Sequence, residues 1–347
     1  MGPDDALKRV AFLLEAEGAP AYKVQAFRRA AAVVSATQPG ELLSLNKQDR
    51  LETLTGIGPS TAGVIREALA GAYPSYLAAL EERAGTLTPG PAQDLLARLK
   101  GDCHSHSDWS DGGSPVKEMA EAAREIGHEY LALTDHSPRL TIAHGLSPDD
   151  LRRQLDLVAE LNDDLHPFRL LTGIEVDILE DGSLDQEEEL LARLDLVVAS
   201  AHSALRMEAA KMTERLVRAV SNPHVDILGH CTGRIVVGRG RPQSQFDHEA
   251  VFGACAANGT AVEVNSRPDR LDPPEELMRL AATLRCRFAI DSDAHAPGQL
   301  RWLSYGCDKA VAADLEAPSI VNTLPLAEFI AWAGRDRRQT PNFTKDR

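Results

Sequence analysis

Hydrophobic residues follow two different rhythms along the chain, and the rhythm changes near residue 100. In residues 7–18 and 22–34, apolar residues recur every three or four positions, which is the spacing of one face of a helix. A second pair of helical patterns surrounds a glycine-rich turn further on. The sequence therefore predicts a small all-α domain at residues 1–84, followed by a Gly- and Pro-containing linker at 85–99.

Beyond the linker, short apolar or β-branched runs alternate with helical patterns. The runs predicted as strands lie at 103–106, 130–136, 169–178, 194–203, 225–230, 260–266 and 287–295. Seven β-then-α units predict parallel strands with right-handed crossovers, in an α/β fold. Nearly every run ends in a polar or ionisable residue, and a barrel gathers the strand carboxyl ends on one face. We therefore expect a distorted (βα)7 barrel at residues 100–335, and a polar, disordered tail at 336–347.

The ionisable residues at these strand ends are mostly histidines and carboxylates. His104 and His106 are two apart, so on a strand both imidazoles reach the same side. The remaining members of the set are Asp111, His136, Glu175, His202, His230, Asp293 and His295. Burying so many ionisable groups together is costly unless cations pair with them. Imidazole and carboxylate ligands favour divalent ions over copper(I), so the sequence predicts a metal cluster.

The order HxH, SDG, TDH, Glu, His, His, DxH resembles that of the polymerase-and-histidinol-phosphatase family, known as PHP domains, from residue 101 to about 330. The resemblance implies a distorted (βα)7 barrel, phosphoester hydrolysis and three divalent ions, with zinc, manganese or iron as the metals. It also implies the ligand sets: His104, His106, Glu175 and Asp293 for one ion; a bridging Glu175 with His202 and His230 for the second; Asp111, His136 and His295 for the third. Glu175, Asp293 and His202 would then carry catalysis.

Arginines supply the candidates for phosphate contact. Arg234 follows the fifth predicted strand, and Arg267 and Arg270 follow the sixth. These loops lie on the expected active face, and guanidinium groups bind phosphate oxygens in pairs. The alternative is that they form ordinary ion pairs within the domain.

The glycine-rich turn of the helical domain has the sequence LTGIGPSTA, at residues 54–62. Glycines let the backbone approach a phosphate, and the N–H groups at the following helix start form an anion site. The predicted DNA contacts are Gly56, Ile57, Gly58, Ser60 and Thr61, and the alternative is a simple helix turn. Residues 1–84 resemble the N-terminal domain of bacterial family X DNA polymerases. Only the linker separates them from the barrel, so the polymerase palm is lacking and polymerase activity is not expected.

Charge and composition restrict the partners. The net charge is −15, yet residues 1–98 contain ten Lys and Arg against eleven Asp and Glu, so the barrel carries most of the negative charge. A protein that coats duplex DNA needs a basic surface, which this chain lacks overall. No apolar run reaches the ~20 residues that span a bilayer, and no apolar leader is present. We expect a cytoplasmic protein without a membrane partner; the sequence leaves its oligomeric state open.

Three functions follow from these features. The leading hypothesis is a metal-dependent phosphoesterase acting at DNA ends, as a 3′–5′ exonuclease or 3′-phosphatase, because an intact ligand set accompanies a DNA-type hairpin. A phosphatase of small metabolites, such as histidinol phosphate or nucleotides, is the second, since an acidic barrel would repel a polynucleotide. A non-catalytic, metal-stabilised module that binds DNA or protein is the third; missing ligand positions would have favoured it.

Overall fold

The computed structural model describes residues 1–84 and 90–334 of the chain. The chain divides into two compact units, at residues 1–88 and 89–347. The predicted tail at 336–347 and the first part of the predicted linker lie outside the described residues. Each unit is considered by itself.

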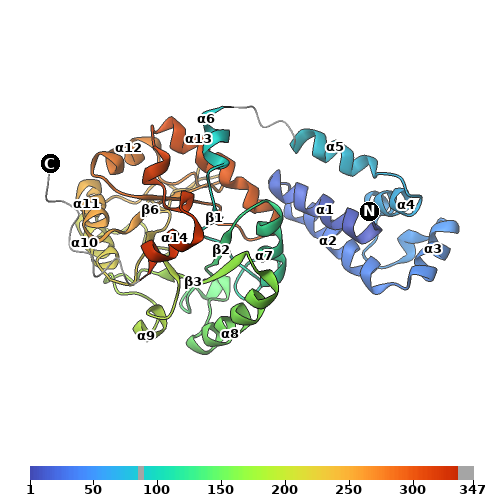
Figure 1. The fold of residues 1–347 in the computed structure, drawn as a ribbon, viewed down its shortest axis with the longest axis horizontal. Helices are drawn as coiled ribbons and strands as arrows, with labels where there is room; N and C mark the ends of the chain where they lie inside the picture. The colour runs from blue at the N-terminus through green and yellow to red at the C-terminus, as the bar shows by residue number, and fades with distance from the viewer. Residues whose placement is uncertain (85–89, 335–347) are drawn as a thin grey trace. The chain divides into compact units, whose positions relative to one another are not determined.

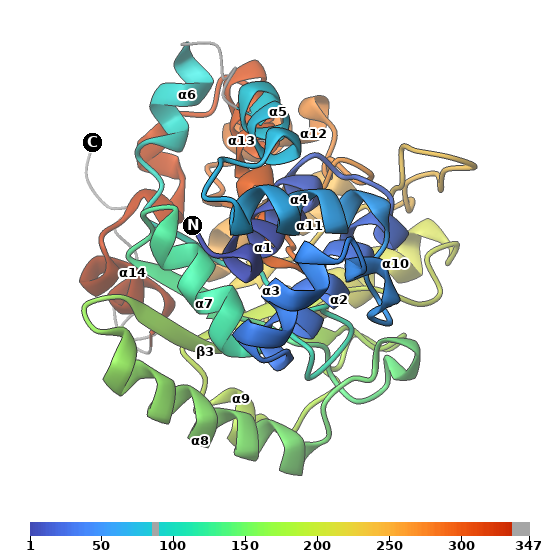
Figure 2. The same cartoon turned by 90° about the vertical axis from the view of Figure 1, so that its right-hand side faces the viewer.

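The first unit is helical, as predicted. Its helices are α1 (Pro3–Ala16), α2 (Ala21–Ala36), α3 (Pro39–Lys47), α4 (Pro59–Leu69) and α5 (Ser75–Ala84), with a 3-10 turn at Leu51–Thr53 before α4. Helix α1 packs against α2, α4 and α5 (Figure 2). Proline occupies the first position of α1, α3 and α4, where its missing N–H costs nothing. Leu7, Phe27 and Ile65 are among the residues buried between these helices.

The second unit contains seven parallel strands in sequence order. They are β1 (Gly101–Asp102), β2 (Tyr130–Leu133), β3 (Arg169–Asp177), β4 (Leu196–Ser200), β5 (Ile227–Leu228), β6 (Ala261–Asn265) and β7 (Phe288–Asp291). Each strand pairs with the next, and a parallel bridge between Ser105 and Ala294 links the segments that follow β1 and β7. The predicted (βα)7 barrel is confirmed. The first strand was predicted at the wrong place: β1 is Gly101–Asp102, so the predicted run 103–106, with His104 and His106, lies in the segment just after it.

Helices surround these strands (Figure 1). They are α6 (Pro91–Leu96), α7 (Val116–Glu125), α8 (Pro148–Leu165), α9 (Glu188–Leu191), α10 (Ala209–Val220), α11 (His248–Asn258), α12 (Glu275–Thr283), α13 (Leu303–Ala312) and α14 (Leu326–Ala333). Helix α6 lies within the predicted linker. Its Leu95 packs into the core of the barrel unit, next to α13, so the second half of the range 85–99 belongs to that unit.

Strand alternation divides the barrel into an apolar layer and a polar layer. Leu171, Ala261 and Ala289 belong to a buried apolar cluster in the barrel interior, which Phe329 of α14 closes at the amino ends of the strands. Glu175 is four residues beyond Leu171 and therefore lies on the same face of β3. The same alternation places the other strand-end residues above the apolar layer. The interior is thus apolar at one end and ionisable at the other.

Asn322 joins the two ends of the sheet. Its backbone carbonyl accepts from Lys100 N at 2.7 Å, and its side-chain amide donates to Gly101 O at 2.9 Å and to Ile290 O at 2.5 Å. Its side-chain oxygen accepts from Ile290 N at 3.1 Å. The residue is fully buried, and its one side chain binds backbone groups of both β1 and β7.

We expect Asn322→Ala to destabilise the barrel by about 3 kcal/mol, because it leaves buried N–H and C=O groups of both strands without partners. Urea unfolding monitored by circular dichroism measures the change. Asn258→Ala, at an exposed position at the end of α11, is the control and should stay within about 0.5 kcal/mol of the parent. Equal stability of the two variants would show that the junction between β1 and β7 does not depend on Asn322.

Candidate metal centre

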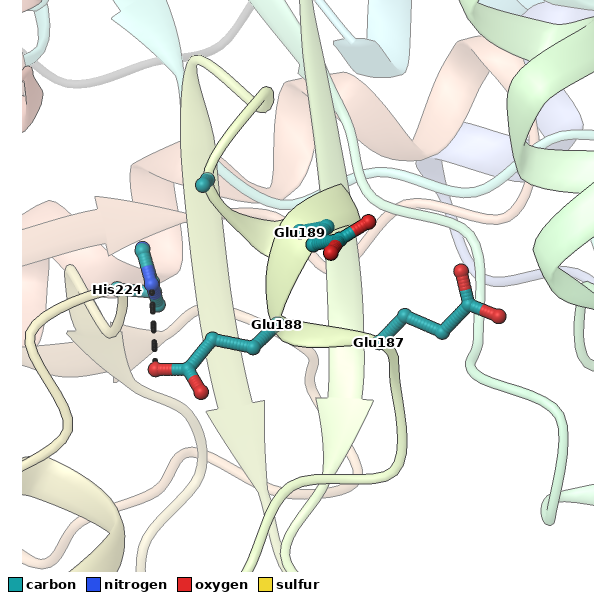
Figure 3. Close-up of a pocket in the computed structure, with 5 residues that line it drawn as sticks. Glu187, Glu188, Glu189 and His224 are labelled. Carbon is teal, nitrogen blue, oxygen red and sulfur yellow. Dashed lines mark ion pairs between the residues drawn. The ribbon is translucent and has the colours of Figure 1, made fainter.

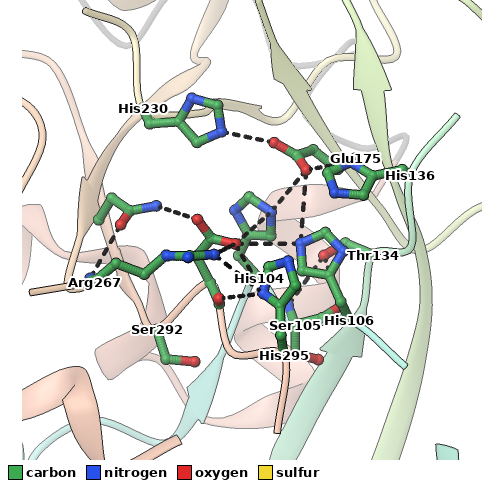
Figure 4. Close-up of polar contacts among 12 residues, drawn as sticks. His104, Ser105, His106, Thr134, His136, Glu175, His230, Arg267, Ser292 and His295 are labelled. Atoms are coloured by element: carbon green, nitrogen blue, oxygen red, sulfur yellow. Dashed lines mark hydrogen bonds and ion pairs between the residues drawn. The ribbon is translucent and has the colours of Figure 1, made fainter. Parts of the chain in front are cut away.

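The predicted ligands converge at the carboxyl ends of the strands. His104 and His106 lie in the segment after β1, where His106 N donates to Ala294 O at 2.8 Å. Both imidazoles are fully buried, and their ring centroids are 5.1 Å apart. Figure 4 shows the Glu175 carboxylate between the imidazoles of His230 and His136. All nine residues predicted as ligands take part in this one cluster, whose inner members are buried.

One side of the Glu175 carboxylate faces the first group. Its Oε2 is 3.4 Å from His104 Nε2 and 3.6 Å from His106 Nε2. Asp293 Oδ1 is 3.3 Å from His106 Nε2 and 3.9 Å from His104 Nε2. Asp293 has a φ of 49°, in the left-handed region that Asp tolerates better than most residues, and Asn265 holds its other oxygen at 3.1 Å. These four residues are those that the family resemblance assigns to the first ion.

The other Glu175 oxygen faces the second group. Oε1 lies 2.9 Å from His230 Nε2 and 3.2 Å from His202 Nε2. A carboxylate whose two oxygens face different sets of imidazoles is arranged to bridge two cations. The bridging role that the resemblance implies for Glu175 stays a prediction, with which the positions of its two oxygens are compatible.

The third group lies nearer the surface. Asp111 Oδ1 is 3.4 Å from His136 Nε2 and 3.3 Å from His295 Nε2, and the Asp111 side chain is about one-third exposed. This group is less separate than the resemblance implies, because His106 lies within the same set of donor atoms. His136 also contacts Glu175 Oε2, at 2.8 Å, through Nδ1. The groups therefore form one continuous cluster.

The donor atoms suit divalent metal ions. His104 Nε2, His106 Nε2, His202 Nε2 and Glu175 Oε2 are buried and have no hydrogen-bond partner among the described residues. Donors bound to one ion at about 2.1 Å lie roughly 3.0–3.4 Å apart, which is close to the separations observed here. Oxygen and nitrogen donors without a thiolate match zinc, manganese or iron(II). Cys103 and Cys231, beside two of the ligands, are packed into apolar clusters.

The electrostatics of the cluster depend on its carboxylates. Burial alone raises the pKa of Glu175, but the imidazoles of His202 and His104 hold that pKa well below its usual range. Burial lowers the pKa of His136, yet Glu175 and Asp111 outweigh it and raise the pKa to about 10. Burial, together with neighbouring imidazoles, holds the pKa of His106 well below its usual range. The carboxylates therefore require positive charge beside them, from protons or from cations.

Further carboxylates, which the sequence analysis did not single out, hold the ligands in place. Glu263 Oε1 lies 2.6 Å from His104 Nδ1, and its other oxygen accepts from His230 N. Asp177 Oδ1 accepts from His202 N at 3.0 Å and lies 3.3 Å from its Nδ1. Such partners fix the orientation and tautomer of a ligating imidazole. A signal was available, because Glu263 stands between two valines in a buried strand and Asp177 is two residues beyond Glu175.

The three candidate arginines have different surroundings. Arg267 Nη1 lies 3.7 Å from Asp293 Oδ1 and 3.3 Å from His295 Nδ1, while Arg270 Nε lies 3.4 Å from Asp293 Oδ2. Arg234 instead donates to the carbonyl oxygens of Arg270 and Leu271, so its guanidinium binds the loop that carries Arg270. A substrate contact by Arg234 stays a prediction, whereas Arg267 and Arg270 already lie at the cluster.

The glycine-rich turn of the helical domain leads into α4 as predicted. Gly56 has a φ of 101°, and an added Cβ would lie 3.3 Å from Val33. Gly58 has a φ of −117°, and an added Cβ would meet nothing within 4 Å, so a side chain would be strained at Gly56 and not at Gly58. The Ile57 and Thr61 side chains are buried, and the Thr61 hydroxyl donates to Gly58 O at 2.9 Å.

DNA contact through Thr61 would therefore use its backbone N–H, whereas the Ile57 N–H already donates to Leu54 O at 3.0 Å. Ser60, by contrast, is exposed at the start of α4. The first N–H groups of a helix have no partner within it, so this end of α4 offers donors to an anion.

A separate acidic pocket lies at the other end of the barrel (Figure 3). Glu187, Glu188, Glu189, Ala192 and His224 line it, and His224 Nε2 lies 3.6 Å from Glu188 Oε1. His224 comes just before β5 and α9 just before β4, so the pocket lies at the amino ends of these strands. Its carboxylates are exposed, and we assign no function to it.

Comparison with known proteins identifies both units. Residues 102–267 match the PHP domain family and residues 4–72 match a helix-hairpin-helix domain family. The DNA polymerase/3′-5′ exonuclease PolX of Bacillus subtilis is 37% identical over 241 residues, which are 70% of this chain but 42% of that protein. A probable phosphatase of Acetivibrio thermocellus is 32% identical over 204 residues, or 56% of this chain and 78% of that protein.

A solved structure also shows likeness to the chain. The histidinol phosphate phosphatase of Lactococcus lactis, complexed with zinc, L-histidinol and phosphate, matches with 17% identity and a TM-score of 0.47, over 63% of this chain and 95% of that one. In the described residues, no helix combines the length and apolar character that crossing a membrane requires.

The chain belongs to the PHP-domain family of metal-dependent phosphoesterases, joined in this protein to an N-terminal helix-hairpin-helix domain.

Proposed function

We propose that this chain hydrolyses phosphoesters at DNA ends, as a 3′–5′ exonuclease or 3′-phosphatase that uses three divalent ions. The observation that carries the proposal is the pairing of a complete ligand cluster with a helix-hairpin-helix turn in one chain. The 37% identical relative, named a DNA polymerase/3′-5′ exonuclease, supports it. The chain spans 42% of that relative's length, so the full activity of the relative is not assigned to this chain.

The side chains of the site would bind either metal ions or phosphate oxygens. His104, His106, Glu175 and Asp293 would hold one ion, Glu175, His202 and His230 a second, and Asp111, His136 and His295 a third. Bound ions of this kind lower the pKa of water towards neutrality and neutralise phosphate charge. Arg267 and Arg270 lie beside Asp293 and are placed to orient phosphate oxygens.

A phosphatase of small metabolites is the second candidate. Relatives named probable phosphatase match 56–65% of this chain, and the net charge of −15 disfavours a polynucleotide near the barrel. A non-catalytic binding module is a weaker candidate, because all nine ligand positions keep a ligating side chain.

A hydrolysis panel with added manganese or zinc separates these functions. It contains a 3′-recessed DNA, a 3′-phosphate DNA, nucleotides and histidinol phosphate. The proposal expects hydrolysis of a DNA end at a higher kcat/KM than that of any small metabolite. Faster hydrolysis of histidinol phosphate or nucleotides would instead establish the second candidate.

Metal removal should abolish activity. Protein purified without chelator should contain more than one equivalent of divalent metal by elemental analysis. Chelation should reduce phosphoester hydrolysis at least about 100-fold and lower Tm by roughly 5 °C or more, because the buried carboxylates lose their counter-charges. Adding manganese, zinc, iron(II) or cobalt back one at a time completes the test, and no recovery with any of them would refute the metal assignment.

Glu175→Gln should reduce turnover by about 10²- to 10⁴-fold. The substitution keeps the shape of the side chain but removes the charge that faces two groups of imidazoles. Steady-state kinetics and circular dichroism measure activity and folding together. Glu160→Gln, at an exposed position on α8, is the matched control and should behave as the parent does. A folded Glu175→Gln variant with parental rates would exclude a bridging role for Glu175.

Gly58→Val should weaken DNA binding by about three- to tenfold at low salt, because its side chain blocks backbone approach to a phosphate. Gly58 has a φ that valine adopts and open space around it, so the fold should survive. Gly40→Val, where an added Cβ also meets nothing within 4 Å, is the control. The effect should shrink as salt rises. Unchanged DNA binding would make the hairpin a simple helix turn or a protein-docking surface.

A further inference from the structure

We propose that a pocket between the loops after β4 and β5 is a nucleotide-binding site. It would hold the nucleoside next to the phosphate at the metal centre, together with the neighbouring phosphodiester. The inference deepens the proposed function, since it names the part of a DNA end that the barrel itself recognises.

The pocket adjoins the metal centre. It is lined by His202, Ala204, Leu205, Arg206, Met207, Arg241, Pro242, Gln243 and Gln245. His202 belongs to both, because its Nε2 lies 3.2 Å from the Glu175 carboxylate. Both walls follow strand carboxyl ends, so the pocket lies on the same face of the barrel as the ligands. A molecule whose phosphate reaches the cluster would extend into it.

The two walls are fixed to one another. Ser244 Oγ donates to Leu205 O at 3.0 Å, and Ser244 N donates to Thr232 O at 2.8 Å. Gly233 has a φ of 63°, and an added Cβ would lie 3.2 Å from the Leu205 methyl groups. Its lack of a side chain therefore lets Leu205 pack against the second wall. The pocket is formed before any ligand arrives, which reduces the ordering cost of binding.

The chemistry of the lining suits a nucleotide. Leu205, Met207 and Pro242 offer an apolar surface for a base or sugar, and the two glutamines offer amide groups to base edges. Among the residues that the structure describes, no carboxylate lines the pocket, although the chain carries a net charge of −15. Its charged members are Arg206 and Arg241, which suit a phosphodiester.

The two arginines differ in their freedom. Arg241 Nε donates to Gly233 O at 2.6 Å, which orients its guanidinium while leaving other N–H donors for a ligand. Arg206 is exposed and has no ion-pair partner among the described residues. Two cations at the rim, beyond those near Asp293, favour a ligand with a second phosphate over a single phosphomonoester.

A hairpin extends the second wall. Ile235 and Arg241 form an antiparallel bridge, and Val236 and Val237 at its tip are 50% and 51% exposed. Val236 N donates to Asp269 O at 2.7 Å, which ties the hairpin to the loop carrying Arg267 and Arg270. The pocket is therefore continuous with the loop that supplies cations at the metal centre. Exposed valines beside it offer further apolar contact to a ligand longer than one nucleotide.

Competition against a chromogenic phosphodiester tests the pocket in the metal-loaded full chain. The competitors are the dinucleotide pTpT and inorganic phosphate, and each protein is compared with its own uninhibited rate. The parent should be half-inhibited by pTpT at a concentration at least about tenfold lower than by phosphate. Arg206→Gln should raise the pTpT concentration about three- to tenfold and change the phosphate concentration less than about twofold. Arg241→Lys, which keeps the charge, should retain most of the pTpT advantage.

Arg124→Gln, with the same loss of charge at an exposed position of α7, is the control and should match the parent for both competitors. Equal inhibition of the parent by pTpT and phosphate, or an Arg206→Gln variant with the parental pTpT value, would overturn the nucleotide site. DNA ends are assayed in parallel. Failure to hydrolyse them, with the pTpT advantage intact and sensitive to Arg206, would reject the DNA-end function and keep the nucleotide site.

Discussion

The burial of one carboxylate, Glu175, governs the rest of the active face. Its side chain is 1% exposed, and imidazoles surround both of its oxygens. A buried charge of this kind is stable only beside opposite charge. The imidazoles supply it when protonated, and divalent cations supply it when the same nitrogens are ligands. The centre thus holds cations because its protein groups are incompletely paired without them.

The barrel makes this arrangement possible by separating its two layers. Leu171 and Glu175 lie on the same face of β3, so both point into the barrel interior. Leu171 belongs to the apolar layer, and Glu175, nearer the carboxyl end of the strand, belongs to the polar layer. Glu263 and Asp177 then fix the imidazoles of His104 and His202 from outside the ligand set. The apolar layer can therefore stabilise the fold, although burying the ionisable groups of the polar layer costs free energy.

Sequence reasoning predicted the barrel and brought together the candidate ligands, because all of them except Asp111 lie in a strand or within four residues of a strand end, where topology largely determines position. Asp111 lies nine residues beyond β1 and was predicted from the order of the motifs. It did not reach residues whose role depends on side-chain direction. Arg234 and Arg267 follow strands in similar ways, yet one binds loop carbonyls and the other lies at the cluster. Backbone angles were also out of reach, so Gly56 and Gly58 could not be distinguished. The short helix α6 was not predicted, because it lies in a Pro- and Gly-containing stretch that was interpreted as a linker.

The link that Asn322 makes between β1 and β7 has a consequence for biosynthesis. The ribosome delivers β1 first, but β7 and the Asn322 amide that binds both strands emerge more than 180 residues later. Asp293 and His295 also arrive only after β7. A nascent chain therefore carries His104, His106 and Glu175 before the residues that complete their cluster have been synthesised. Tight metal capture and barrel closure become late, coupled events, so truncated translation products lack the assembled centre.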